Sequence, residues 1–289
     1  MKIQGRIIQG IGGLYHISAL GKIYFARPKG IFRKKGVEPV VGDFVEIDVI
    51  SHELMEAVIT QIYPRINQLL RPKVSNVNQS ILVFSCSLPA INLDLLDRLT
   101  IVSHQQGLTN IVIVLNKIDE AINLDRLESV ACSYKAIGYN VLYTSAVTGA
   151  GVGELVDILA NKTSVFCGAS GVGKSSLINR LLPSANMDVG VLSQKGNRGK
   201  HTTRFSKLIE LYPDSFIVDS PGFSSITFDF TKNSLDQYFK EFVPFLDICR
   251  FANCSHIKEI DCAIKDNVGV AISQERYLRY KKIYEECSS

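Results

Sequence analysis

Residues Gly168 to Ser176 carry the spacing of a phosphate-binding loop, GxxxxGKS. The stretch GASGVGKSS follows the apolar run SVFC and precedes LINRLL, so a glycine-rich turn would join a buried strand to a helix. Backbone N–H groups there would bind phosphate, Lys174 would bridge the β- and γ-phosphates, and the Ser175 hydroxyl would hold Mg²⁺. The expected contact residues are Gly168, Ala169, Ser170, Gly171, Val172, Gly173, Lys174, Ser175 and Ser176. This loop alone does not distinguish ATP from GTP.

A second motif indicates which base is bound. Residues 116–119 read NKID, match NKxD, and follow the apolar run NIVIVL. The Asp119 carboxylate can accept two hydrogen bonds from guanine, whereas adenine would leave it unpaired, and the Lys117 side chain can lie along the ring. Asn116 can tie this loop to the phosphate loop. Alone, the four residues could equally be a helix cap. The dipeptide Ser145-Ala146, after the run NVLYT, supports the guanine interpretation because its backbone N–H would meet the guanine oxygen.

A third set of residues would complete the magnesium and γ-phosphate site. Asp219 ends the run SFIVD and opens DSPG, a DxxG motif in which the aspartate supports Mg²⁺ and Gly222 donates its N–H to the γ-phosphate. Either Thr202 or Thr203 would complete the Mg²⁺ shell beside Ser175, and the sequence does not decide between them.

The order of these motifs is not that of Ras-like GTPases, in which the phosphate loop comes first. Along this chain NKID is followed by SA, GASGVGKS, a threonine segment and DSPG. Independent accidents would not produce a rotated version of the correct order. We therefore interpret the domain as a circularly permuted GTPase, which is feasible because the termini of compact domains often lie close together.

Four potential metal ligands lie close together near the end of the chain: Cys249, Cys254, His256 and Cys262. Three thiolates and one imidazole match a closed, tetrahedral zinc site that leaves no position open for catalysis. We expect one structural Zn²⁺ there, stapling a small helical segment. The other cysteines are expected to be small buried hydrophobic residues: Cys86, Cys132, Cys167 and Cys287.

Length, charge and cysteine count indicate the cellular compartment and restrict the possible partners. The chain has 289 residues, a net charge of +4 and seven cysteines. The odd cysteine count argues against a secreted disulfide framework, and neither a signal peptide nor a membrane-spanning run is evident, so we expect a cytoplasmic protein without a membrane partner. The small net charge does not by itself indicate nucleic acid, so local clusters must carry that argument.

The pattern of apolar residues divides the chain into three parts. Short alternating runs separated by glycine and proline predict a small β-barrel, an OB fold, over residues 1–66. After a connector, PRINQLLRPKVSNVNQ, that begins at Pro64, strands alternate with amphipathic helices and predict an α/β domain with a doubly wound parallel sheet over residues 67–224. The remaining residues, 225–289, predict a helical zinc-binding domain. In its run YLRYKKIYEE we expect the tyrosines to face inward and Arg279, Lys281 and Lys282 to face solvent.

A basic loop in the predicted barrel, ARPKGIFRKKG, offers cations and Phe32 for phosphate contact and base stacking. An ordinary solvated loop is an equally good interpretation.

These motifs together resemble the RsgA (YjeQ/YloQ) family of circularly permuted GTPases that depend on the small ribosomal subunit. The similarity extends over nearly the whole chain, including RPKVSNVNQ, GKHTT and the zinc motif Cys-x4-Cys-x-His-x5-Cys. It implies GTP and GDP as ligands with Mg²⁺ and Zn²⁺, and late maturation of the small (30S) subunit as the process. The partner would be that subunit's 16S rRNA and proteins, hydrolysis would be stimulated by the subunit and coupled to release, and the protein would be a monomer that does not bind DNA. The implied catalytic residues are His201, Lys174, Thr202 and Thr203.

Two other functions remain open from the residues alone. Phe223 occupies the place after DxxG where many GTPases have a catalytic glutamine, so the chain could be a GTP-sensing RNA-binding module that hardly hydrolyses GTP. It could also be a permuted GTPase that acts on the large subunit or on a non-ribosomal RNA.

Overall fold

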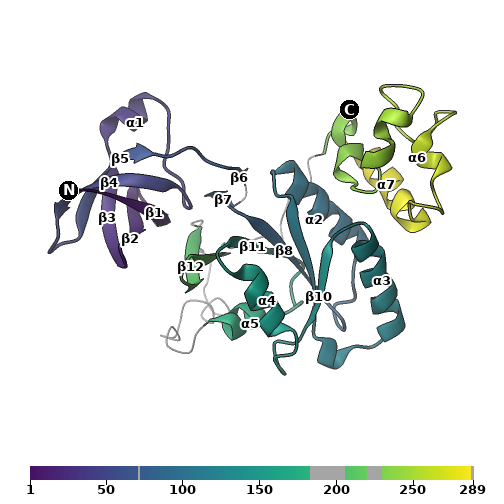
Figure 1. The fold of residues 1–289 in the computed structure, drawn as a ribbon, viewed down its shortest axis with the longest axis horizontal. Helices are drawn as coiled ribbons and strands as arrows, with labels where there is room; N and C mark the ends of the chain where they lie inside the picture. The colour runs from purple at the N-terminus through teal and green to yellow at the C-terminus, as the bar shows by residue number, and fades with distance from the viewer. Residues whose placement is uncertain (71, 183–205, 220–229, 288–289) are drawn as a thin grey trace.

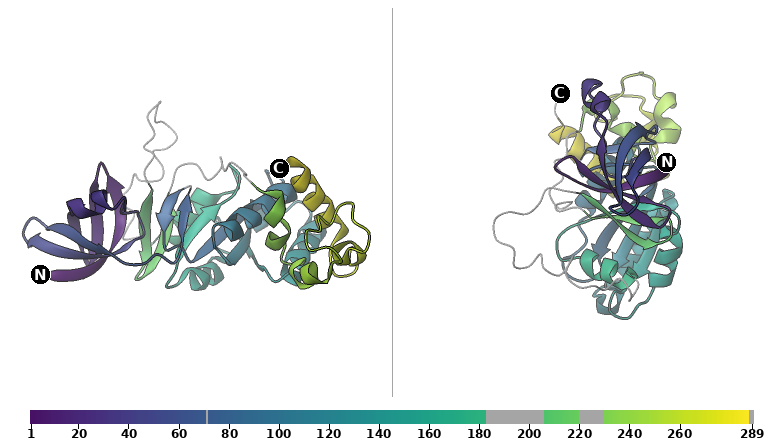
Figure 2. Two further views of the ribbon diagram at one scale, coloured as in Figure 1. Left: turned by 90° about the horizontal axis from the view of Figure 1, so that it is seen from above. Right: turned by 90° about the vertical axis from the view of Figure 1, so that its left-hand side faces the viewer.

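Three bodies lie in a row along the long axis of the molecule (Figures 1 and 2). The computed structural model describes residues 1–70, 72–182, 206–219 and 230–287. A strand-rich body is followed by a central sheet with helices and then by a small helical body at the other end. No helix in the described ranges is long and apolar enough to cross a membrane.

The N-terminal body is the closed barrel that the alternating runs predict. Its strands are β1 (Lys2–Ile11), β2 (Leu14–Ala19), β3 (Lys22–Pro28), β4 (Phe44–Ser51) and β5 (Glu56–Ile62). The strand order is β1-β2-β3-β5-β4, and pairing of β1 with β4 closes the barrel. Alternate residues such as Ile7, Ile17 and Ile47 are fully buried, because successive side chains of a strand point to opposite faces. The basic loop contains a short helix, α1 (Gly30–Lys34), that has no buried residue.

The segment expected to be a connector has structure of its own. It contains the hairpin β6 (Gln68–Leu70) and β7 (Lys73–Ser75), whose Leu69 and Val74 are fully buried. Arg65 makes two hydrogen bonds of 2.7 Å to the carboxylate of Asp43, which is fully buried and also accepts from the Ser75 hydroxyl. A bidentate arginine–carboxylate pair is geometrically specific, so the segment is fixed against the barrel.

The central body is a largely parallel sheet with strand order β10-β9-β8-β11-β13-β12. Its strands are β8 (Gln79–Ser85), β9 (Asn110–Asn116), β10 (Asn140–Thr144), β11 (Thr163–Cys167), β12 (Lys207–Tyr212) and β13 (Ser215–Asp219). Only β12 runs antiparallel to its neighbour within this body. A single pairing of Gln9 with Lys207 joins β12 to β1, so the sheet continues into the barrel.

Helices cover both faces of the central sheet. They are α2 (Leu93–Gln105), α3 (Leu124–Ala136), α4 (Val152–Leu159) and α5 (Lys174–Leu181). Along β8, Leu82 and Phe84 belong to the cluster that includes α2 and α3, whereas Ile81 and Val83 pack with α4 and α5. Every residue of β8 is buried, as expected for a central strand of a two-sided parallel sheet.

The C-terminal body consists of short helices around one aromatic core, as expected. They are η5 (Lys232–Ser234), η6 (Asp236–Tyr238), η7 (Val243–Ile248), α6 (Ala263–Asp266) and α7 (Gln274–Glu286). Phe239, Phe242 and Tyr280 pack together there, and Ile101 and Val102 of α2 join the same cluster. One expectation about the cysteines is wrong, because Cys132 is exposed on α3, whereas Cys86, Cys167 and Cys287 are buried.

A buried ion cluster joins the C-terminal body to the central one. The Asp97 carboxylate on α2 is fully buried and accepts hydrogen bonds from Arg276 and Arg279 of α7 and from Tyr134 of α3. Arg276, of which 2% is exposed, also forms a pair with Glu241. The expectation that Arg279 faces solvent is therefore wrong, since its guanidinium group donates to the buried Asp97 carboxylate. Tyr277 and Tyr280 do face inward, and Tyr284 is partly buried.

Replacing Asp97 with alanine should destabilise this junction strongly. Removing one partner from a buried cluster leaves an uncompensated charge, here one net positive charge because Glu241 offsets only one of Arg276 and Arg279, at a cost of about 3–5 kcal/mol. Glu275→Ala is the matched control, since Glu275 contacts the same Arg279 but is 78% exposed. Urea unfolding followed by circular dichroism should show a lower midpoint for Asp97→Ala only. Equal midpoints for the two variants would contradict this account.

Candidate functional site

The motif residues come together at one edge of the central sheet. Strands β8, β9, β10, β11 and β13 run parallel to their neighbours in this part of the sheet. Their carboxyl ends therefore meet at the same edge, where open α/β sheets bind ligands. The phosphate loop follows β11, the NKID segment begins on the last residue of β9, Ser145 follows β10, and Asp219 ends β13. Segments far apart in the sequence thus meet at one edge of the sheet.

The glycines of the phosphate loop are required by its backbone. Gly168, Gly171 and Gly173 have φ values of +143°, +82° and +91°, which residues with a Cβ rarely adopt. A Cβ on Gly168 would also lie 2.2 Å from the Val83 carbonyl oxygen of the neighbouring strand. The loop leads directly into α5, whose first N–H groups point back toward it. Ser170, Gly171, Ser175 and Ser176 are exposed, Ala169 is half-buried, and Val172 is buried.

The side chain of Lys174 is folded over this loop. Its ammonium donates hydrogen bonds to the carbonyl oxygen of Gly168, at 2.7 Å, and to that of Ala169. Burial lowers the pKa of Lys174 from its ordinary value, because the charged form loses water. A partly desolvated cation at the phosphate loop interacts more strongly with an anion than a fully hydrated one would.

Asn116 ties the phosphate loop to the NKID loop, as the sequence predicts. Its amide nitrogen donates to the Val172 carbonyl oxygen at 2.9 Å, and its amide oxygen accepts from the Thr144 hydroxyl at 3.2 Å. The residue is 1% exposed, so both bonds are sheltered from water. Gly173 leaves room for this contact, since a Cβ there would lie 2.3 Å from the Asn116 amide nitrogen.

The other residues expected at the base lie next to this tie. Lys117 has a left-handed backbone with φ +64°, and the exposed Asp119 lies on the short helix η1 (Ile118–Glu120). Ser145 is buried and shapes its turn, because its hydroxyl accepts from the N–H groups of residues 147 and 148 while its own N–H donates to residue 150. The following Ala146 is half-buried at the same edge.

The residues expected to bind magnesium and the γ-phosphate are described only in part. Asp219 is partly exposed, and it follows Val218, which pairs with Val165 of the strand that leads into the phosphate loop. The structure therefore places Asp219 at the carboxyl end of the strand next to β11, which leads into the phosphate loop. His201, Thr202, Thr203 and Gly222 lie outside the described residues.

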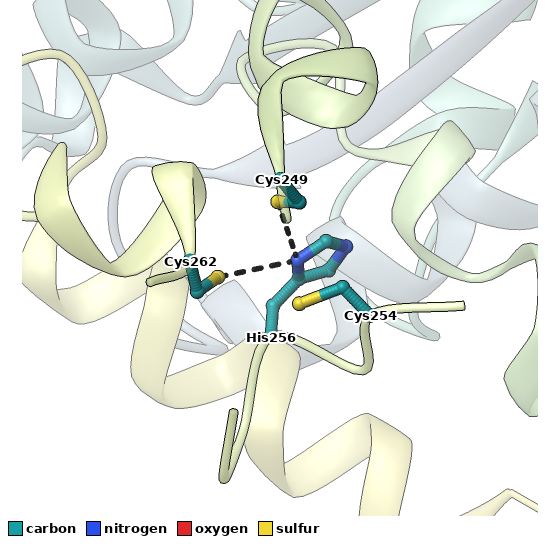
Figure 3. A group of neighbouring side chains, drawn as sticks. All are labelled: Cys249, Cys254, His256 and Cys262. Atoms are coloured by element: carbon teal, nitrogen blue, oxygen red, sulfur yellow. Dashed lines mark hydrogen bonds between the residues drawn. The ribbon is translucent and has the colours of Figure 1, made fainter. Parts of the chain in front are cut away.

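The four residues expected to bind zinc form one cluster (Figure 3). One ligand atom from each of Cys249, Cys254, His256 and Cys262 lies within 4.8 Å of the others. The His256 Nδ1 atom is 3.6 Å from the Cys249 sulfur and 3.4 Å from the Cys262 sulfur. Tetrahedral zinc with ordinary bond lengths separates a nitrogen and a sulfur ligand by about 3.6 Å. Donor set and spacing therefore both fit a closed zinc site.

A further residue orients the histidine of this cluster. The His256 Nε2 atom is 3.2 Å from the Asp236 carboxylate on η6, which leaves Nδ1 directed at the sulfur atoms. Such outer carboxylates fix the tautomer of a metal-binding histidine. No sequence pattern indicates Asp236, because it lies twenty residues from His256 and outside the cysteine spacing. Burial raises the pKa of the Cys254 thiol to about 12. Because a cysteine binds a metal cation as the thiolate, cation binding at Cys254 must displace the thiol proton.

Comparison with known proteins agrees with this geometry. Residues 62–229 match the family model described as RsgA GTPase, and residues 4–58 match the RsgA N-terminal domain. The chain belongs to the RsgA GTPase family. It is therefore a GTPase, that is, a GTP hydrolase.

Relatives with the RsgA name are similar over the full chain. The protein of Caldanaerobacter subterraneus subsp. tengcongensis named small ribosomal subunit biogenesis GTPase RsgA is 41% identical, covering 99% of this chain and 96% of the relative. The Clostridium kluyveri protein of the same name is 42% identical, covering 99% of each.

Solved RsgA-family structures share the fold. YjeQ from Thermotoga maritima superposes with a TM-score of 0.85 at 29% identity, covering 99% of this chain and 98% of that one. YloQ, described as a circularly permuted GTPase, gives 0.82 at 29% identity, covering 99% and 95%. The rotated motif order is thus a property of the RsgA fold, and the interpretation of the order as a permutation is confirmed.

A methyl group at Gly173 should abolish nucleotide binding. Gly173→Ala would strain a backbone with φ +91° and force the Cβ into the Asn116 amide, so the phosphate loop would lose its tie. Gly153→Ala is the matched control, since Gly153 lies in α4 with open space around its Cβ position. Calorimetric titration with GDP should show no measurable binding for Gly173→Ala and wild-type affinity for Gly153→Ala. Wild-type affinity in both variants would show that the tie is dispensable.

Proposed function

We propose that this GTPase acts in biogenesis of the small ribosomal subunit, binding and hydrolysing GTP at the edge of the central sheet. The observation that carries the proposal is the Asn116 tie, which holds the NKID segment, proposed to bind guanine, against the phosphate loop. The relatives named for small-subunit biogenesis cover nearly the whole length of the chain. The process named for them is therefore the best hypothesis for this chain too.

Each motif residue has a proposed task in the reaction. Asp119 accepts two hydrogen bonds from guanine, Lys117 covers the ring, and the backbone at Ser145 and Ala146 meets the guanine oxygen. The phosphate-loop N–H groups and Lys174 hold the β- and γ-phosphates. Ser175 and Asp219 would hold Mg²⁺, which neutralises charge on the phosphate oxygens when bound. Thr202 or Thr203 and the Gly222 N–H are proposed to meet the metal and the γ-phosphate.

The water-positioning group is proposed to be His201. Phe223 has no polar atom that could orient a water, so another residue must do so, and the family resemblance favours this histidine. Its place in the chain, beside the threonines of GKHTT, is suitable for a residue that acts on the γ-phosphate side.

The basic loop of the barrel is proposed to contact RNA. Arg27, Lys29, Arg33, Lys34 and Lys35 are all exposed, and none of them forms an ion pair with a residue in the described ranges. Phe32 between them is half-buried against the barrel core, which fixes the loop. Unpaired cations on a fixed loop suit the phosphates of rRNA, because binding releases the counterions of the nucleic acid.

The decisive experiment measures GTP turnover with purified small subunits, large subunits or bare rRNA added. We expect slow intrinsic turnover and stimulation by small subunits alone, by up to ~10³–10⁵-fold, as when a catalytic group is supplied in trans. Stimulation by large subunits instead would move the function to that particle. No hydrolysis under any condition would favour a GTP-sensing binding module. The Gly153→Ala variant should show the same intrinsic turnover and the same stimulation as wild type.

The Cys₃His cluster is proposed to hold one structural zinc ion. Cys254→Ser should remove the metal and unfold the C-terminal body while nucleotide binding is largely kept, since the nucleotide edge lies in another body. Cys287→Ser is the control, because Cys287 is buried in the same body but lies outside the cluster. Metal analysis should find about one zinc per chain in wild type and in Cys287→Ser only. Wild-type protein without zinc would end the proposal.

A further inference from the structure

We infer that the segment joining β8 to α2 forms another wall of the nucleotide site, in which Ser85 and Ser87 position the guanine-binding loop. We define the β8–α2 loop as residues 86–92, and Ser85 is the last residue of β8. None of the GTPase motifs includes this loop. The inference rests on the guanine role proposed above for Lys117 and Asp119.

Backbone pairing sets the β8–α2 loop against the NKID segment. Ser85 pairs with Asn116 in the parallel register of β8 and β9, so the two strands end side by side. The Cys86 N–H then donates to the Asn116 carbonyl oxygen at 2.7 Å, and the Ile122 N–H reaches the Cys86 carbonyl oxygen at 3.5 Å. The guanine-binding segment is therefore attached to the β8–α2 loop at its start and at its end.

The carbonyl oxygen of Leu88 holds the ammonium of Lys117. The donor and acceptor atoms are 2.7 Å apart, and the same oxygen accepts from the Ser85 hydroxyl at 3.2 Å. That hydroxyl in turn accepts from the Ser87 N–H at 3.0 Å. The Leu88 side chain is mostly exposed, so the turn is fixed by these bonds and not by packing of the leucine. Ser85, of which 1% is exposed, thereby orients the Leu88 carbonyl group, and that carbonyl positions the Lys117 ammonium.

Ser87 holds the end of the guanine-binding segment that follows Asp119. Its hydroxyl donates to the Glu120 carboxylate at 3.0 Å. Lys117 and Glu120 flank Asp119, so the two serines fix the residues on both sides of the carboxylate that reads guanine. This support has a physical purpose, since the left-handed backbone of Lys117 is unfavourable for a residue with a side chain and persists only where its surroundings hold it.

The β8–α2 loop also reaches the phosphate side of the site. The Cδ atom of Pro89 lies 3.6 Å from the position that a Cβ on Gly171 would occupy, which places it against the tip of the phosphate loop. The loop thus touches both the guanine-binding and the phosphate-binding segments. We conclude that Ser85 and Ser87 are positioning residues for ground-state binding of the nucleoside, not for the chemical step.

A double-mutant cycle between Ser85 and Lys117 tests the inference, with GDP affinity measured by calorimetry. Ser85→Ala should weaken GDP binding about threefold to tenfold, the loss expected for one hydrogen bond. In a Lys117→Ala background the same change should have an effect of less than about twofold, because the ammonium that Ser85 positions is gone. The KM for GTP should rise by the same factor in Ser85→Ala while kcat is unchanged.

The matched control is Ser103→Ala, which removes another buried serine hydroxyl from the same body, away from the nucleotide. Its GDP affinity should equal that of wild type. Full GDP affinity in Ser85→Ala, or an equal loss in both backgrounds, would overturn the inference while leaving the proposed function intact. Unchanged GDP affinity in Lys117→Ala would instead refute the proposed guanine role, and the inference with it. If thermal melting shows Ser85→Ala to be unfolded, Ser87→Ala combined with Glu120→Ala supplies the equivalent cycle.

Discussion

The buried amide of Asn116 connects two loops that the chain order keeps 56 residues apart. Its bonds to Val172 and Thr144 draw together the carboxyl ends of β11, β9 and β10, and Gly173 of the phosphate loop leaves room for it. Nothing in this tie depends on which loop comes first in the chain. The permuted sequence therefore keeps a GTPase site, because the parallel sheet and its non-covalent contacts fix the positions of the loops.

The other two bodies are attached to this central sheet by buried arginines. The Arg6 guanidinium of β1 lies between the rings of Phe44 and Phe216, each 4.9 Å away, and so joins the barrel to β13. Burial lowers the pKa of Arg6 to about 10, which still leaves the group charged at neutral pH. At the opposite end Arg276 and Arg279 meet Asp97. The planar, delocalised guanidinium suits both settings better than a lysine ammonium would.

The sequence predicts well what depends on short motifs and on the period of apolar residues. The barrel, the two-sided parallel sheet, the Asn116 tie and the Cys₃His cluster all follow from such local patterns. The hairpin of residues 68–75 does not, since its place depends on Asp43, a carboxylate more than twenty residues before it. Nor does the inward position of Arg279, which is set by a carboxylate 182 residues away. Contacts between residues so far apart along the chain leave no periodic pattern in the sequence.

The burial of Asp97 has a consequence for how the molecule responds to ionic strength. Salt weakens exposed pairs such as Arg250 with Asp261, whose side chains are 67% and 56% accessible, because counterions can approach both partners. The Asp97 carboxylate is fully enclosed, so dissolved ions cannot come between it and the guanidinium groups. Concentrated salt would therefore weaken the exposed pairs of the molecule while the contact between the C-terminal body and α2 persists.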